Sequence, residues 1–525
     1  MRSVAIAAVV IALGNVISRL LGLVREQVMA ALFGASAATD AFVVASAVPQ
    51  IVYDLLVGGA ISAALVPVFV DAIDDEERLW RLLSTVLTLV ALVLTGVALV
   101  LGLFAPVVVD LLASGLADDA RAVAIPMVRV MLVAVVLQGL AGIMTAVLYA
   151  RRRVALPAFA VAVYNGAIIV CALLLHQVLD VYALVVGVVL GAAGQALLQL
   201  PGLGRWRFRP RLELDRPEIR TILRLYCPVA LGMIVTIIGI VIDRNLASGL
   251  AEGSFSVMNY ATRLIQFPLG LVATATAVAV LPLLAKHASA LAAAGQSGTT
   301  DAEAAEGYRD TLRFGARIVL LLMLPAAVGL IVLREPLVQL LFQRGRFGEV
   351  ETARTALVFL AYAPQLPFTA LDQLFIVAFY ARKDTRTPVA IGVVTVLLYL
   401  VSALALIGPL DAAGLALANA IQNSAHGLIL LAILERTGTR LLDAELAFWT
   451  TRVLLASVGV GAVLWIVGGA LLPVTGGSLI LSTVLAALAG IAGLVYLALL
   501  DLLGVRDGRQ VFGIVRDRLS RSHPD

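Results

Sequence analysis

Three arginines stand inside long apolar stretches of this sequence, where little water is available to solvate a charge. Arg19 and Arg25 lie in the stretch 3–33, and Arg263 lies in the stretch 256–285. Ionisable side chains in segments of this kind are costly and mark substrate or ion pathways. Guanidinium groups donate paired hydrogen bonds that suit phosphate oxygens. We therefore expect these arginines to form a cationic cavity that binds an anionic, phosphate-bearing substrate.

Arg263 has polar neighbours on its own segment. Asn259, Arg263 and Gln266 fall on one face of a helix, just before Pro268. The proline ring removes a backbone hydrogen bond, and backbone of this kind is tolerated at membrane depth where it lines a cavity. We therefore predict that Asn259 and Gln266 line the same cavity as Arg263.

Arg19 and Arg25 are not on one face of a straight helix, because six residues separate them. Gly22 lies between them, and a break in the helix at this glycine would turn both side chains inward. The alternative is that the two arginines reach the membrane interface, or pair with Glu26 and Asp40 as structural ion pairs.

Other polar groups in the apolar stretches have both a functional and a structural interpretation. Asp40 begins a stretch, where a carboxylate stabilises the first turn of a helix. Asp243 is suited to a coupling cation or a proton, or to pairing with a nearby base. Asn419 and Asn423 stand one turn apart, as cation ligands or as partners in hydrogen bonds between helices.

The composition sets the class of protein in which these residues act. The chain has 525 residues, of which 61% are hydrophobic and 14% charged, with a mean hydropathy of +1.03. This predicts an all-α polytopic membrane protein, because the apolar runs are long and continuous, unlike the alternating strands of a barrel. The fourteen predicted spans lie at about 3–33, 40–70, 82–112, 122–150, 154–176, 181–203, 220–249, 256–285, 310–333, 350–380, 387–407, 412–434, 447–472 and 479–503.

No pattern in the sequence indicates an enzyme. The motifs of phosphate-binding loops, serine hydrolases and zinc proteases are absent. Cys171 and Cys227 lie in apolar stretches, and four scattered histidines form no cluster suited to a metal. We expect no metal, no cofactor and no nucleic-acid partner.

The basic residues of the connections set the expected orientation. Arginine and lysine gather in alternate connections, which by the positive-inside rule places both termini in the cytoplasm; the connection 334–349 is the exception. The connection 204–219 carries five arginines with Trp206 and Phe208, and either rests on anionic lipid headgroups or is a solvated loop. The connection 286–309, rich in alanine, glycine and serine, is predicted to be a mobile loop with some helix.

The two halves of the chain resemble each other. The stretch 148–152 is echoed by 379–383, and Pro49 and Asp40 stand opposite Pro268 and Asn259. Six spans in each half predict two lobes related by a pseudo-two-fold axis along the membrane normal, with a substrate bound between them and alternating access. The predicted regions are an N-terminal lobe at 1–204, a basic cytoplasmic linker at 205–219, a C-terminal lobe at 220–437, two additional spans at 438–505 and a cytoplasmic tail at 506–525.

Four stretches carry a resemblance to a known family. These are SRLLGLVREQVMAALFGASAATDAFVVASAVPQ, NYATRLIQFPLG with AVLPLLAKHA, LVQLLFQRGRFGEVET and FYARKDTRTPV. They resemble the MurJ/MviN family of bacterial lipid II flippases, within the multidrug/oligosaccharidyl-lipid/polysaccharide exporter superfamily. The resemblance covers essentially the whole chain. It implies that undecaprenyl-pyrophosphate-linked disaccharide-pentapeptide is moved to the outer leaflet for peptidoglycan synthesis, and that spans thirteen and fourteen form a groove for its lipid tail.

The resemblance also implies roles for single residues. Arg19, Arg25 and Arg263 match the family's cavity arginines, and Asp40 matches its essential acid. Asp243 matches a sodium-ligand position described in some members.

The chain departs from the family pattern in three places. Tyr53 and Asp54 stand where an arginine pair is frequent, and Gly58 stands where Glu is frequent. These differences leave another lipid-linked substrate as an alternative. Tyr399 and Ala403 occupy positions that would complete a sodium site and supply no carboxylate. Proton coupling and coupling to the membrane potential therefore stand beside sodium coupling as alternatives.

The sequence thus predicts a lipid II flippase of the bacterial cytoplasmic membrane. Its expected partners are lipid II, membrane lipids and cell-wall synthesis proteins. The alternatives are a related exporter of another undecaprenyl-linked saccharide or of drugs, and a membrane scaffold without transport. A sealed interface between the lobes, without a cavity, would favour the scaffold.

Overall fold

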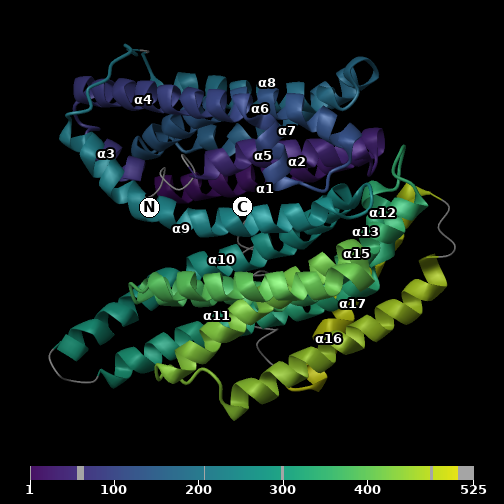
Figure 1. Ribbon diagram of the computed structural model, residues 1–525. Coiled ribbons are helices and arrows are strands. Elements are labelled where there is room, and N and C mark those ends of the chain that lie inside the picture. The colour runs from purple at the N-terminus through teal and green to yellow at the C-terminus, as the bar shows by residue number, and fades with distance from the viewer. Residues whose placement is uncertain (1, 56–63, 206, 297–300, 473–476, 506–525) are drawn as a thin grey trace, which may run out of the picture. The chain divides into compact units, whose positions relative to one another are not determined.

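The computed structural model describes residues 2–55, 64–205, 207–296, 301–472 and 477–505. Every regular element in these ranges is a helix (Figure 1). The predicted cytoplasmic tail and Gly58 lie outside the described residues. The all-helical class predicted from the continuous apolar runs is confirmed.

The chain divides into two compact units. Unit 1 comprises Met1–Asn259 together with Phe342–Glu351, and unit 2 comprises Tyr260–Leu341 together with Thr352–Asp525. A short segment of the second half of the sequence therefore belongs with the first half.

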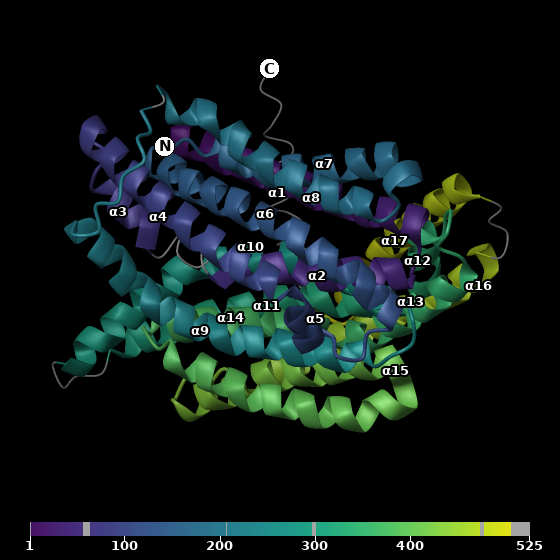
Figure 2. The same ribbon diagram turned by 45° about the horizontal axis from the view of Figure 1, so that its top comes forward.

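Unit 1 is a bundle in which α6 occupies the central place. This helix packs against α2, α4 and α8, while α7 packs against α1 and α8, and Figure 2 shows these helices from a second direction. The side chains of α6 are buried on several faces of the helix, and most of them are apolar. The elements are α1 (Arg2–Phe33), α2 (Ala37–Tyr53), α3 (Val66–Val70), α4 (Glu76–Leu103), α5 (Ala105–Leu112), α6 (Asp118–Ala150), α7 (Ala155–Leu179), α8 (Tyr182–Gln199), η3 (Leu200–Leu203) and α9 (Pro217–Ser248).

Helix α10 (Ser254–Gln296) begins in unit 1 and continues into unit 2. Within unit 2, α11 packs against both α14 and α16, and α16 packs against α17. The other elements are α11 (Ala302–Val332), α12 (Arg334–Phe342), α13 (Glu349–Tyr362), η4 (Ala363–Gln365), α14 (Leu366–Ala381), α15 (Arg386–Arg436), α16 (Ala444–Leu471) and α17 (Ser478–Leu502).

Membrane-length helices account for much of both units. Within the described ranges, nine helices are long and apolar enough to cross a bilayer. One of them, α15, covers two predicted spans, because it folds back at Asp411, whose φ of 53° is not helical. The polytopic membrane class is therefore confirmed, and the number fourteen stays a prediction.

The backbone carries the internal repeat predicted from sequence. Arg152 and Lys383 both adopt positive φ values, 58° and 60°, in the matching turns after α6 and α14. Asp180 and Asp411 do the same, at 46° and 53°, with the same separation along the chain. Equivalent non-glycine residues thus adopt the same rare conformation in each half, which supports a repeated fold.

One local expectation is wrong, and a second is met only in its helical part. Helix α1 is continuous from Arg2 to Phe33, with no break at Gly22. A glycine permits a kink but does not impose one when every backbone hydrogen bond can form. The predicted mobile loop at 286–309 is mostly helical, because α10 extends to Gln296 and α11 begins at Ala302. Its alanines favour helix.

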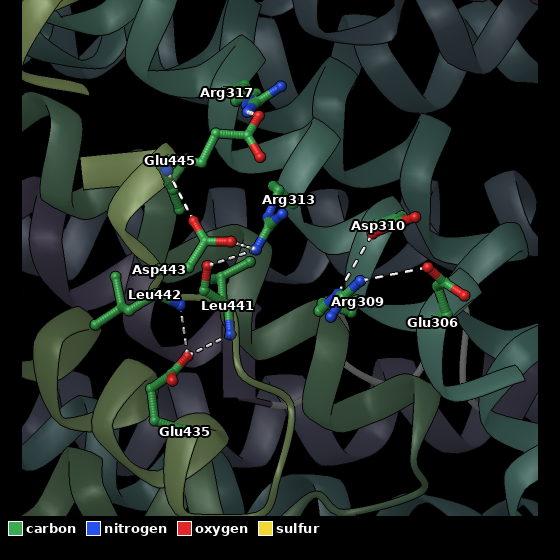
Figure 3. Close-up of polar contacts among 11 residues, drawn as sticks. Glu306, Arg309, Asp310, Arg313, Arg317, Glu435, Leu441, Leu442, Asp443 and Glu445 are labelled. Atoms are coloured by element: carbon green, nitrogen blue, oxygen red, sulfur yellow. Dashed lines mark hydrogen bonds and ion pairs between the residues drawn. The ribbon is translucent and has the colours of Figure 1, made fainter. Parts of the chain in front are cut away.

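Ion pairs join α11 to the start of α16, the first of the two additional helices (Figure 3). Arg313 Nη2 lies 2.5 Å from Asp443 Oδ2, and Arg317 Nη2 lies 2.7 Å from Glu445 Oε1. Asp443 also caps α16, since its Oδ1 accepts a hydrogen bond from the Leu446 amide at 2.8 Å. These contacts, which we call the α11–α16 clamp, fix the beginning of α16 against α11.

Candidate functional site

Arg25 is the centre of a polar network within unit 1. Its Nη2 lies 2.5 Å from Glu26 Oε1, and its Nη1 donates to Asn165 Oδ1 on α7 at 3.1 Å. The other carboxylate oxygen of Glu26 accepts from Asn259 Nδ2 on α10 at 3.0 Å. Asn165 Nδ2 in turn donates to the Ser18 carbonyl at 3.2 Å. We call Arg25, Glu26, Asn165 and Asn259 the Arg25 network.

The two charges of this network differ in exposure. The Glu26 side chain is 1% exposed and that of Arg25 is 19% exposed. A buried carboxylate needs a paired cation and hydrogen bonds, and Glu26 has both. The two bonds use one N–H of each terminal nitrogen, and no described residue accepts a hydrogen bond from Arg25 Nε, so the guanidinium keeps donors for a further anion.

Asp40 belongs to the first turn of α2, and its carboxylate binds the start of α10. Its Oδ2 accepts from the Gly253 amide at 2.7 Å, and its Oδ1 accepts from the Ser256 amide at 2.8 Å and from the Ser256 hydroxyl at 2.6 Å. The carboxylate, on a residue that is 4% exposed, thus satisfies donors that the first turn of α10 leaves without helical partners.

Segments of unit 1 that are distant in the sequence contact the turn between α1 and α2 or its ends. The Arg346 amide donates to the Ala31 carbonyl at 2.9 Å, and Glu252 accepts from the Ala37 amide at 2.9 Å. Gly345 has a φ of +59°, and a Cβ on it would lie 2.1 Å from the Ala31 oxygen. Only glycine allows this approach, which explains why Phe342–Glu351 belongs to unit 1.

The remaining predicted substrate residues are more exposed. Arg19 lies exposed on α1 and makes no ion pair with any described residue. Arg263 and Gln266 are exposed on α10 in unit 2, and Arg263 Nη1 lies 3.4 Å from Gln266 Oε1. The structure therefore brings Arg25 and Asn259 together through Glu26, and leaves Arg19 outside this network.

The predicted coupling residues fall in different units. Asp243 is half-buried on α9 in unit 1, and Asn419 lies on α15 in unit 2. Asn423 Nδ2 donates to Asn419 Oδ1 at 3.0 Å and to Gln365 Oε1 at 2.6 Å. The bond from Asn423 to Gln365 joins two elements, as in the structural alternative, whereas the bond from Asn423 to Asn419 lies within α15. The part of the chain that the structure describes contains no group of three histidine, cysteine, aspartate or glutamate side chains suited to a metal.

Two residues of the site were not singled out from the sequence. Asn165 is an amide in the apolar stretch 154–176, which is the one signal that marks it. Ser256 carries no such signal, because serine is common at helix starts. At the departures from the family pattern, Tyr53 is half-buried and Asp54 Oδ2 accepts from Gln50 Nε2 at 2.9 Å.

Taken together, the helices and the charges held among them define a polytopic membrane protein of the transporter class. A family model described as lipid II flippase MurJ matches residues 29–485. Lipid II flippase MurJ of Burkholderia cenocepacia is 32% identical over 81% of this chain and 82% of the relative. A probable lipid II flippase MurJ of Vibrio cholerae is 30% identical over 95% and 96%. The chain therefore belongs to the MurJ family.

Solved structures show the same fold. A lipid II flippase MurJ in an inward closed conformation matches with a TM-score of 0.79 and 21% identity, over 94% of this chain and 98% of that one. An inward-facing multidrug resistance MATE family transporter of the MOP superfamily matches with a TM-score of 0.63 and 16% identity, over 81% and 96%. The fold is thus shared beyond the MurJ family.

Proposed function

We propose that this chain is a flippase that moves lipid II from the inner to the outer leaflet of the bacterial cytoplasmic membrane. Its family and the names of its relatives support this function. The observation that carries it in the structure is the buried Arg25 network, a fixed guanidinium inside a membrane protein. A flippase moves its lipid intact, so the protein is a transporter and not an enzyme.

The geometry suits recognition of a pyrophosphate. Glu26 and Asn165 orient Arg25, so little side-chain freedom is lost when an anion binds. The remaining guanidinium donors form charge-assisted hydrogen bonds with phosphate oxygens. Arg19 and Arg263, both exposed, supply further positive charge, and Asn259 and Gln266 supply amides. We propose these residues as the substrate contacts, with Asp40 acting through its hold on the start of α10.

Arginine replacement in living cells tests this assignment. Arg25→Ala and Arg263→Ala are expected to abolish growth of a bacterium depleted of its own lipid II flippase, at unchanged protein levels. Arg129→Ala is the matched control, because Arg129 is an exposed arginine on α6 whose Nε donates to the Gly102 carbonyl. Growth supported by both site variants would refute the proposed role of the arginines.

A second candidate substrate is another undecaprenyl-linked saccharide. It is favoured by Asp54, a carboxylate bound to Gln50 at a position where a base was expected from the family. Purified protein presented with lipid II and with a different undecaprenyl-linked lipid separates the two candidates. Preference for lipid II supports the main proposal, and preference for the other lipid supports the second.

Orientation and coupling form part of the same proposal. The arginine-rich connections support a cytoplasmic location for both termini, and cell-wall synthesis proteins and membrane lipids are the expected partners. Asp243 and Asn419 stay predictions for a coupling ion, with sodium, protons and the membrane potential as the candidate driving forces.

A further inference from the structure

Asp372 and His426 form a polar pair inside unit 2 that the proposed substrate contacts do not use. Asp372 lies on α14 and His426 on the second half of α15, in stretches predicted to span the membrane. His426 Nδ1 lies 2.6 Å from Asp372 Oδ1, and His426 Nε2 lies 3.1 Å from the Pro388 carbonyl oxygen. The two side chains are 14% and 15% exposed.

The partners of the imidazole fix how many protons the pair must hold. A carbonyl oxygen only accepts, so Nε2 must carry a hydrogen that it donates to Pro388. At 2.6 Å, Nδ1 and Oδ1 also need a hydrogen between them, whether it resides on the imidazole or on the carboxyl group. Without this proton, two lone pairs would face each other at hydrogen-bond distance. The observed arrangement therefore binds one proton, and its loss breaks the contact.

The pair joins three helical segments. His426 belongs to the second half of α15, Pro388 to the first half, and Asp372 to α14. The two halves of α15 meet at the non-helical Asp411. At Gly427 a Cβ would lie 3.1 Å from the Phe368 carbonyl oxygen of α14, so the backbones approach closely beside the pair. Loss of the proton would therefore break the contact between α14 and the second half of α15, while His426 Nε2 still donates to Pro388 in the first half.

The other charged groups near these elements have their own partners. Asp384, in the turn before α15, accepts from the Arg386 and Thr387 amides. Arg382, at the end of α14, donates to Thr437 and Thr439. On α11, which packs against α14, the basic side chains that pair with carboxylates are Arg309, Arg313 and Arg317. On its own helix, His426 follows Asn419 and Asn423 along one face, which supplies amides and no charge.

We propose that the Asp372–His426 pair is the proton-binding site that couples transport to a proton. The proton is bound while α14 and the second half of α15 are held together, and is released when they separate. This inference rests on the proposed lipid II flippase function. It assigns the coupling ion to a site distinct from Asp243 and Asn419.

The first experiment examines the proton directly and needs no substrate. The full chain is labelled with ¹⁵N-histidine, and its four histidines are assigned by single replacements. At neutral pH, Nδ1 of His426 is expected to be protonated or hydrogen-bonded, and Asp372→Ala should convert it to a bare nitrogen. A bare Nδ1 in the unaltered protein would overturn the proposal.

The second experiment measures coupling in vesicles that contain lipid II and an internal pH indicator. The unaltered protein is expected to move protons with lipid II, and its flipping rate should fall with rising pH by up to about tenfold per pH unit, as for one titrating group. Asp372→Asn keeps a donor to Nδ1 without an exchangeable charge. It should flip lipid II with a flat pH profile and no proton movement.

His176→Gln is the control variant, since the hydrogen bonds of His176 within the described residues go to carbonyl groups of its own helix. It should keep the pH profile of the unaltered protein. An unaltered protein whose flipping ignores pH would overturn proton coupling. An unaltered protein that never flips lipid II would instead refute the proposed function, and the histidine spectra would still decide whether the proton is bound.

Discussion

The Arg25 network and the α11–α16 clamp use the same chemistry in different surroundings. Each joins arginine to a carboxylate, at 2.5 Å for Glu26 and 2.7 Å for Glu445. Glu26 is 1% exposed, whereas the Glu445 and Asp443 side chains are 70% and 41% exposed. The clamp joins the interior of α11 to the start of α16, and the Arg25 network lies inside the bundle of unit 1. Burial of the carboxylate therefore distinguishes the Arg25 network from the clamp, because the arginines Arg25, Arg313 and Arg317 are similarly shielded, at 19%, 13% and 23% exposed.

The difference has an energetic basis. A buried pair has lost its water, so each charge depends on its partner and on nearby hydrogen bonds. Exposed pairs are solvated whether or not they meet, and they add little to stability. Replacing the arginine should therefore have a large effect in the Arg25 network, where it leaves a buried carboxylate, and a small one in the clamp, where it leaves an exposed carboxylate.

The largest effect is expected for Arg25→Ala. It leaves the Glu26 carboxylate buried without its cation, which costs about 3 kcal/mol of unfolding free energy, the lower end for a broken buried pair. Thermal unfolding of the purified protein measures this loss. Adding Glu26→Gln should restore most of the stability and none of the transport. Restored transport in the double variant would show that Arg25 serves only to neutralise Glu26.

A smaller effect is expected at the start of α10. Asp40→Ala leaves the Gly253 and Ser256 donors without an acceptor, at about 1–3 kcal/mol for each buried group that stays unsatisfied. Asp40→Asn keeps one acceptor oxygen and should lose less. Hydrogen exchange of the amides at 253–256 reports the change. Equal protection in the alanine variant and the unaltered protein would contradict the capping role.

The smallest effect is expected in the clamp. The Leu446 amide and Arg313 hold the pKa of Asp443 below its ordinary value of 3.8. Because the folded-state pKa is depressed, the stability that Asp443 contributes is present above pH 3.8 and is lost as pH falls through the lowered value. Asp443→Asn keeps the cap and removes this pH dependence. Unfolding scans of both proteins below pH 5 would show equal acid sensitivity if the ion pair contributes nothing.

The charges of the site were predictable from the sequence, but most of their partners were not. Arginine inside an apolar run is conspicuous, and Glu26 follows Arg25 directly. Asn165 is 140 residues away, and Asp40 meets Ser256 at a separation of 216 residues. Such contacts depend on which helix faces pack together, and the hydrophobic pattern of a membrane helix specifies this poorly, since lipid-facing and buried surfaces are both apolar.

The fold was predictable where the pattern was long and uniform. Continuous apolar runs predict helices, and the repeat predicts equivalent turns, as the positive φ values of Arg152 and Lys383 show. Breaks were less predictable. Gly22 does not interrupt α1, whereas Phe104 separates α4 from α5 before Pro106, inside one predicted span. A helix breaks where a backbone hydrogen bond is lost or where packing requires a bend. Of the two residues, only the proline is a sequence signal of a lost hydrogen bond.

Reconstituted flipping tests the central claim, that the buried Arg25 binds the pyrophosphate of lipid II. Vesicles carrying the purified protein and lipid II are sampled for lipid II that appears in the opposite leaflet. The unaltered protein and Arg317→Ala, which removes the Glu445 pair and the contact of the guanidinium with the Trp449 ring, should flip at similar rates. The Arg25→Ala, Glu26→Gln variant should fold and show no flipping above empty vesicles. Flipping by that variant at the unaltered rate would contradict the account.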